Sequence, residues 1–158
     1  MNVEVKQMPA LRVAAVHHVG SYQRISEAFG RLGDLAGRAG LLEGKPTMLA
    51  LYYDDSDVTP EAELRSDAGL VVPESVQLPP GLDEHRLPAG RYACTVHIGP
   101  YEQLADTWAR FMGQWLPQSG ERMAAEGTSF EIYVNNPTDV PKAELRTELY
   151  IPLAPSAG

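Results

Sequence analysis

An internal repeat constrains the fold of this chain more than any other feature of the sequence. Residues 12–41 (RVAAVHHVGSYQRISEAFGRLGDLAGRAGL) align with residues 91–120 (RYACTVHIGPYEQLADTWARFMGQWLPQSG) at an offset of 79. Residues 52–72 align with residues 133–153 at an offset of 81, so two residues are inserted between the matched segments. We therefore expect two related halves.

Both halves show the same predicted order of elements: a lead-in, an alternating strand, an amphipathic helix and two more strands. In the first half the lead-in VEVKQM is predicted to be an opening strand. The helices are predicted to begin after Ser21, a good N-cap residue, and at Pro100, which suits a first helical turn. Residues 74–90 contain three prolines and no sustained periodicity, so they are predicted to connect repeats at about 1–75 and 83–154. The predicted fold class is α+β: one domain over residues 1–158, built from tandem β-α-β-β modules with the helices on one side of an antiparallel sheet.

Alternation of side chains along a strand predicts which residues face the helices. The apolar set Phe130, Ile132 and Val134 is assigned to the helix side, which leaves Glu131 and Tyr133 on the other side. In the first half the repeat assigns Leu49, Leu51 and Tyr53 to the helix side and Met48, Ala50 and Tyr52 to the other. In the last strand Leu145, Thr147, Leu149 and Ile151 are assigned to the helix side. The predicted helix-free side therefore carries three tyrosines and two acids: Tyr52, Tyr133, Tyr150, Glu148 and Asp67.

Two interpretations of this helix-free side remain open. It is a solvent-facing surface where Glu148 pairs with an arginine across strands, or it lines a ligand cleft between the two halves. In a cleft, a buried carboxylate is costly unless a cation neutralises it, and aromatic rings add cation–π attraction of roughly 0.5 to 2 kcal/mol each. Such a cleft would select flat, apolar and often cationic ligands.

The charge balance and the apolar runs exclude several classes of function. The chain has 13 basic and 21 acidic side chains, and the basic ones form no stripe that could neutralise a phosphate backbone. No apolar run approaches the roughly 20 residues that span a bilayer, and the N-terminus lacks the order of a signal peptide. We expect no direct nucleic-acid binding, no membrane insertion and a cytoplasmic location.

Candidate metal and cofactor motifs are weak. His17 and His18 are adjacent in a strand and cannot share a face, so a zinc site is not predicted, and His18 and His97 are expected to bind backbone groups before the helices. The acids at 54, 55 and 57 lack the glycine and the closing glutamate of a calcium loop. No cofactor motif is present, and Cys94 is expected to be a buried, inert thiol.

Four motifs together resemble the GyrI-like small-molecule-binding family: HxGxY before each helix, WLPQSG, YYDDSDVTP followed by ELR, and the terminal TELYIPL. The family includes the DNA gyrase inhibitory protein and the effector-binding domains of multidrug-responsive transcription regulators. The resemblance covers residues 3–153 and implies two modules related by a pseudo-twofold axis, with a ligand cleft at their junction. From the missing motifs, we expect no cofactor.

The resemblance also suggests which residues hold the ligand. Glu148 occupies the position of the buried acid that binds lipophilic cations in the family, and Tyr52, Tyr53, Trp108 and Trp115 match aromatic pocket positions. Core packing is the competing interpretation for the two tryptophans, more firmly for Trp108 because its counterpart Phe29 is also aromatic. The regulators carry a DNA-reading helix-turn-helix before this domain, and we expect none here.

Three functions follow as hypotheses. The first is binding or sequestration of planar, lipophilic or cationic xenobiotics without turnover. The second is a hydrolase that opens cyclopropane-bearing genotoxic natural products, with Glu148 as the catalytic base and Tyr133 or Tyr52 orienting the leaving group. The third is inhibition of DNA gyrase through protein–protein contact.

Overall fold

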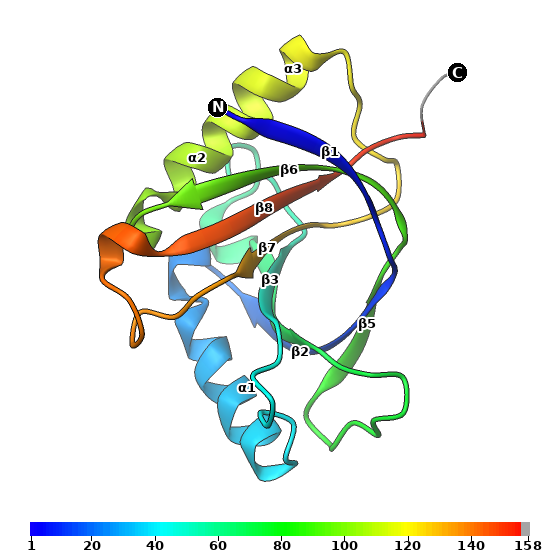
Figure 1. Ribbon diagram of the computed structural model, residues 1–158, viewed down its shortest axis with the longest axis vertical. Coiled ribbons are helices and arrows are strands. Elements are labelled where there is room, and N and C mark those ends of the chain that lie inside the picture. Colours follow the sequence, from blue (N-terminus) through cyan, green and yellow to red (C-terminus); the bar gives the residue numbers. More distant parts are fainter. Residues whose placement is uncertain (156–158) are drawn as a thin grey trace. The chain divides into compact units, whose positions relative to one another are not determined.

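A computed structural model describes residues 1–155 of the chain and shows an α+β fold (Figure 1). The chain divides into two compact units. Unit 1 consists of Met1–Pro9 and Ala89–Gly158, and unit 2 consists of Ala10–Pro88. Among the described residues, each unit contains four strands in antiparallel pairs and one main helical segment. The α+β class and the packing of helices against one side of the strands are confirmed within each unit.

Unit 2 has the strand order β3-β4-β2-β5. Its elements are β2 (Leu11–Val19), a short 3-10 turn η1 (Tyr22–Arg24), α1 (Ser26–Arg38), β3 (Met48–Tyr52), η2 (Glu61–Glu63), β4 (Arg65–Val71) and β5 (Asp83–Leu87). The Ser21 hydroxyl accepts a hydrogen bond from the Gln23 amide, as expected of an N-cap, although regular α-helix begins only at Ser26.

Unit 1 has the strand order β1-β6-β8-β7. Its elements are β1 (Val3–Met8), β6 (Gly90–Ile98), η3 (Tyr101–Gln103), α2 (Leu104–Arg110), a π-helical turn η4 (Phe111–Trp115), α3 (Leu116–Ser119), β7 (Ser129–Tyr133), η5 (Lys142–Glu144) and β8 (Arg146–Pro152). The helix passes through Pro117, which lies in the first turn of α3, and stops at Gly120 with a left-handed backbone.

The opening strands are exchanged between the repeats. β1 precedes β2 in the sequence but pairs with β6, and β5 precedes β6 but pairs with β2. Residues Asp83–Leu87, inside the predicted connector, thus form an edge strand. Its sequence DEHRL has four polar residues out of five because an edge strand has one neighbour and much solvent, so it shows no apolar alternation.

Equivalent glycines shape the turn between strand and helix in both units. Gly20 and Gly99 have φ of 121° and 133°, values that a residue with a Cβ atom rarely adopts. Their amides bind the Leu64 and Leu145 carbonyls at 2.7 and 2.8 Å. The imidazoles of His18 and His97 bind the carbonyls of Ser21 and Pro100 at 3.0 and 3.1 Å, which confirms their predicted role.

Each helical segment packs on one face of its unit. In unit 2, α1 buries Ala28, Leu32 and Ala36 against Ala14, Val16, Ala68 and Leu70. In unit 1, Leu104 and Phe111 are buried against Ala93, Leu149 and Ile151. A fully buried leucine or phenylalanine contributes about 1.5 to 3 kcal/mol, so these contacts fix the helix face of each unit. No helix within residues 1–155 has the length and apolar character needed to cross a membrane.

The predicted faces are right for β8 and wrong for β3 and β7. Leu149 and Ile151 lie on the helix face as predicted. Glu131 pairs with Leu149 in register, so Glu131 and Tyr133 also lie on the helix face, while Phe130 and Ile132 lie opposite. Met48 packs against the α1 cluster, which places Ala50 and Tyr52 on the helix face of unit 2 and Leu49, Leu51 and Tyr53 opposite.

The physical reason is that both faces of these strands are buried. Phe130 and Glu131 are each 1% exposed although they point to opposite faces of β7. An apolar side chain therefore does not identify the helix face in these strands.

Candidate functional site

The seven predicted site residues fall on opposite faces of their units. Tyr52, Tyr133, Trp108 and Trp115 lie on the helix faces, whereas Glu148, Tyr150 and Asp67 lie on the faces opposite the helices. The helix-free face with three tyrosines and two acids is therefore not formed as predicted. The helix face of unit 1 instead holds an acid that the sequence interpretation assigned to the other side, Glu131.

Glu131 is a buried carboxylate beneath the main helix of unit 1. Its side chain projects from β7 and is 1% exposed, and its Oε1 atom accepts a hydrogen bond of 2.8 Å from the indole Nε1 of Trp108 on α2. A buried carboxylate loses its hydration, and a donor such as the indole N–H compensates part of that loss. Trp108 thus belongs to the apolar stripe of its helix, but its indole N–H makes a polar contact with Glu131.

Two tyrosines flank this carboxylate. The rings of Tyr101 and Tyr133 meet edge to face, with centroids 5.5 Å apart and planes at 62°. Burial raises the pKa of Tyr101 above its usual range, and the negative charge of Glu131 raises it further. Glu131, Trp108, Tyr101 and Tyr133 are referred to below as the Glu131 site.

The aromatic surface continues along the helix through a π-helical turn. Trp108 contacts Phe111 at 6.0 Å between ring centroids, and Phe111 contacts Trp115 at 5.6 Å. Phe111 is fully buried, while both tryptophans keep part of their surface exposed. The π-helical turn spans Phe111–Trp115, and such turns in α-helices are frequent at functional sites.

Unit 2 repeats the aromatic pair without the acid. Tyr22 and Tyr52, the counterparts of Tyr101 and Tyr133, have ring centroids 4.8 Å apart. Burial raises the pKa of Tyr22, whose hydroxyl donates to the Asp54 carbonyl at 2.7 Å. The residue equivalent to Glu131 is Ala50, which is fully buried. An acid on the helix face is therefore a property of unit 1.

Glu148 lies on the opposite face of unit 1 and is partly exposed. Its Oε1 atom accepts a hydrogen bond of 2.9 Å from the Tyr150 hydroxyl, and its neighbours in register are Val96 and Ile132. Tyr150 stacks on Phe130 with centroids 4.7 Å apart and planes at 14°. Burial raises the pKa of Tyr150, and the rings of Tyr150 and Phe130 are 3% and 1% exposed.

Asp67, the counterpart of Glu148, is enclosed by donors. Its carboxylate is 1% exposed, and Oδ1 lies 2.7 Å from His17 Nδ1. Oδ2 accepts from the Tyr53 hydroxyl at 2.5 Å and lies 3.0 Å from His85 Nε2. His85 reaches Asp67 across the small Ala15 of the intervening strand β2. These three groups, which come from β2, β5 and the end of β3, contact both oxygens.

The sequence interpretation did not identify Glu131, His17 and His85 as functional or structural partners. It named Tyr53 as a pocket position but not as a hydrogen-bond partner of Asp67. Asp67 and His17 both lie on strands that the sequence predicted. That they face each other depends on the register between β2 and β4, which the sequence alone does not show. His85 belongs to a strand that was not predicted. Cys94 is buried as expected, and burial raises the pKa of its thiol. Within residues 1–155, no group of three or more His, Cys, Asp or Glu side chains has an arrangement that could hold a metal ion.

The sequence matches the family model of the GyrI-like small molecule binding domain over residues 1–154. A protein of Yersinia enterocolitica named DNA gyrase inhibitor is 34% identical over 135 residues, covering 83% of this chain and 82% of that protein. A protein of Erwinia billingiae with the same name is 31% identical over 159 residues, covering 98% of each.

Solved structures share the fold at low sequence identity. The EcmrR C-terminal domain has a TM-score of 0.79 at 18% identity and covers 97% of each chain. A hydrolase from Listeria innocua has a TM-score of 0.67 at 17% identity, covering 96% of this chain and 91% of that one. SAV2435, solved with bound tetraphenylphosphonium, has a TM-score of 0.66 at 13% identity, covering 98% of this chain and 95% of that one.

Proposed function

Because this chain belongs to the family of GyrI-like small-molecule-binding domains, we propose that it binds planar or lipophilic organic cations with a buried carboxylate as the anchor. The observation that carries the proposal is the Glu131 site, in which a carboxylate that is 1% exposed lies among Trp108, Tyr101 and Tyr133. A cation that replaces lost hydration at this carboxylate is favoured, and the rings add cation–π attraction of about 0.5 to 2 kcal/mol each.

Glu131 suits this role better than Glu148 for two reasons. Glu131 is buried, so its charge is screened less by water than the charge of the partly exposed Glu148. The rings beside Glu131 keep part of their surface accessible, whereas Phe130 and Tyr150 beside Glu148 are almost fully buried and have little surface to offer a ligand. Glu148 stays the second candidate anchor.

Asp67 is the least suited of the three acids. Both of its oxygens already accept hydrogen bonds, Oδ1 from His17 and Oδ2 from Tyr53, and Oδ2 also lies at ion-pair distance from His85. A cationic ligand would have to displace these donors. Trp115, which lies on the same helical segment as Trp108, is proposed to extend the binding surface without contributing charge. Tyr52 is proposed to bind ligand only within unit 2, where it pairs with Tyr22.

The test is calorimetric titration with tetraphenylphosphonium, the cation bound by the structural neighbour SAV2435. Glu131→Gln should weaken binding at least roughly tenfold, which corresponds to about 1.4 kcal/mol, because it removes the charge and keeps the shape. Glu148→Gln is the matched control and should change affinity less than about twofold. Tetraphenylborate, an anion of similar shape, should not bind.

A different result would change the assignment. If Glu148→Gln abolishes binding while Glu131→Gln leaves it intact, the anchor is Glu148. If neither substitution weakens binding, or if the anion binds as well as the cation, the proposal of an acidic anchor is wrong.

Turnover is the second candidate function, and one structural neighbour named a hydrolase favours it. A carboxylate close to a tyrosine of raised pKa could act as base and acid in opening a cyclopropane ring with water. Glu131 with Tyr101 is the candidate pair. The predicted arrangement of Glu148 with Tyr133 is not formed, because Tyr133 lies on the helix face of unit 1 and Glu148 on the opposite face, and Tyr52 belongs to unit 2. Mass spectrometry of a cyclopropane-bearing alkylator should then show water addition faster than in buffer, and no acceleration would exclude this substrate class.

Gyrase inhibition through protein–protein contact is the third candidate, since relatives carry that name. A supercoiling assay with excess purified protein tests it directly, and unchanged supercoiling would speak against it. The ligand cleft between the two modules and the cytoplasmic location stay predictions.

A further inference from the structure

Strand β1 has one unpaired edge. It lies at the end of the unit 1 strand order, where six residue pairs from Val3↔Thr95 to Met8↔Gly90 join it to β6 (Figure 1). No strand among residues 1–155 pairs with its other edge. An unpaired edge presents a row of backbone N–H and C=O groups that another strand can bind.

The sequence of β1 is complementary to itself in the antiparallel direction. When two copies of VEVKQ are aligned about Val5, Glu4 of each copy lies opposite Lys6 of the other. Opposite charges in directly facing positions stabilise antiparallel strands, and a twofold axis creates the Glu–Lys pair twice. Val5, which is 46% exposed, would lie opposite its own copy.

The charged side chains of β1 are available for such pairing. The side chains of Glu4 and Lys6 are 72% and 38% exposed, and their contact with each other is long, at 3.7 Å. An exposed ion pair of this kind contributes little in water, so exchanging it for a cross-strand pair has a small cost.

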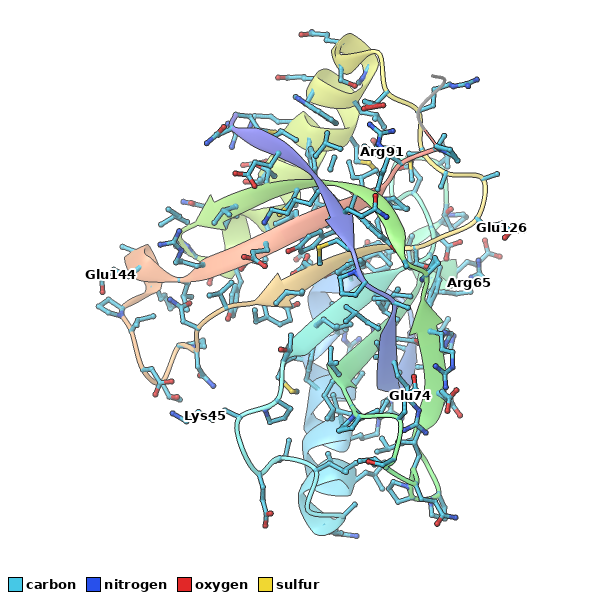
Figure 2. All side chains as sticks on the ribbon, turned by 45° about the vertical axis from the view of Figure 1, so that its right-hand side comes forward. Lys45, Arg65, Glu74, Arg91, Glu126 and Glu144 are labelled. Atoms are coloured by element: carbon cyan, nitrogen blue, oxygen red, sulfur yellow. The ribbon has the colours of Figure 1, made fainter. Side chains whose placement is uncertain are left out.

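The corresponding edge strand of unit 2, β5, is different. Its Glu84 and Arg86 also alternate in charge, but Arg12 binds Glu84 at 3.0 Å and Arg86 binds both oxygens of Glu74, which is labelled in Figure 2, at 2.7 and 2.8 Å. His85 is held by Asp67. Pairing of β5 with another strand would compete with these contacts.

We propose that two copies of this chain associate through antiparallel pairing of their β1 strands, centred on Val5. The occupant is a second copy because the edge is complementary in charge to itself. The six residues of β1 form a small interface, so the dimer is weak and forms in the micromolar range or above. This association is independent of the ligand proposed above.

Sedimentation equilibrium from low micromolar to millimolar concentration tests the proposal. Lys6→Glu and Glu4→Lys each place like charges opposite one another twice, and each should weaken the dimer roughly tenfold, or about 1.4 kcal/mol. The double substitution Glu4→Lys with Lys6→Glu recreates the complementary pattern and should restore the dimer. Lys45→Glu, the same charge change at the exposed loop residue labelled in Figure 2, is the matched control and should have no effect.

Hydrogen exchange gives a second readout, because amides of β1 should become more protected as the concentration rises, while those of β5 should not. Three outcomes would overturn the proposal. The protein could stay monomeric over the whole range, it could dimerise with no response to the β1 charge changes, or the double substitution could fail to restore what the single ones remove. Circular dichroism shows that each variant is folded, and both positions are on the surface of the strand.

Discussion

Replacing Asp67 with Asn is expected to loosen β5 and to destabilise unit 2 by about 2 kcal/mol. The carboxylate forms hydrogen bonds of 2.7 Å with His17 and 2.5 Å with Tyr53, and its Oδ2 atom lies at ion-pair distance, 3.0 Å, from His85 Nε2. Asparagine keeps the shape and one acceptor oxygen, which His17 can still bind. Its amide group is a donor where the carboxylate had a second acceptor, so Tyr53 loses its acceptor and His85 loses its charged partner.

The magnitude follows from the exposure of the three donors. A hydrogen bond to a charged group contributes about 1.5 to 3 kcal/mol, roughly twice the contribution of a neutral one. The two histidine side chains are 46% and 42% exposed, so water replaces part of what they lose. The substitution also removes a buried charge, which offsets part of the loss. A net cost of about 2 kcal/mol remains, below the sum of two charged hydrogen bonds and one ion pair.

The assay is native-state hydrogen exchange together with urea unfolding. Because His85 joins β5 to Asp67, amides of β5 should exchange about 30-fold faster in Asp67→Asn, the factor that corresponds to about 2 kcal/mol. Glu148→Gln is the matched control, because Glu148 holds the equivalent position in unit 1. Glu148 is partly exposed, and within residues 1–155 its side chain accepts one side-chain hydrogen bond, from the Tyr150 hydroxyl. It should cost less than about 1 kcal/mol. Equal costs for the two substitutions, or unchanged exchange in β5, would refute the reasoning.

Three further predictions concern glycines, tyrosines and the tryptophan–glutamate pair. A Cβ atom on Gly69 would lie 2.5 Å from Val13 Cγ1, so Gly69→Ala should lower the unfolding free energy by about 1 to 3 kcal/mol. A Cβ atom on Gly30 in α1 would have no neighbouring atom within 4 Å, so Gly30→Ala should raise the unfolding free energy by about 0.5 to 1 kcal/mol. Urea titration measures both changes. The pKa of Tyr53 is raised first by burial and then by its hydrogen bond to Asp67, so its contribution to stability is complete below the ordinary tyrosine pKa of about 10 and is lost as the pH rises further. Absorbance of tyrosinate at alkaline pH should show this loss, and Tyr53→Phe should reduce it. Trp108→Phe and Glu131→Ala each break the 2.8 Å hydrogen bond between these residues, so their combined cost should be smaller than the sum of the single costs, and additive costs in urea unfolding would contradict the coupling.

The sequence predicted the strand, helix, strand, strand order of both halves because that order depends on local signals, but it did not predict β5. Ser21 accepts its capping hydrogen bond, and Gly20 and Gly99 adopt the positive φ that a turn before the helix requires. The face of β7 could not be predicted in the same way. Apolar residues of a strand identify its helix face only if the other face is exposed to solvent. In β7 both faces are buried, since Glu131 and Phe130 are each 1% exposed.

Pairing between strands also limited what the sequence could predict about the candidate site. Leu149 was assigned to the correct face, and its register partner is Glu131, so knowledge of the β7–β8 register alone would have identified the buried acid. The Asp67 cluster needed more, because one of its donors comes from β5, a polar edge strand with no apolar alternation. Register and edge pairing are set by contacts distant in the sequence.

The differences between the two repeats occur in groups of residues that depend on one another. Where unit 1 has Glu131 with the donor Trp108, unit 2 has Ala50 with Phe29, which offers no donor and needs none. Where unit 2 has Asp67 with His17, the equivalent positions in unit 1 are Glu148 and Val96, and the donor to Glu148 comes from Tyr150 instead. A carboxylate and its donor must change together, because either one alone leaves a polar group without its hydrogen bond. Unit 1 thus has an acid on each face, and unit 2 has Asp67 on the face opposite its helix; each acid is accompanied by its own hydrogen-bond donor.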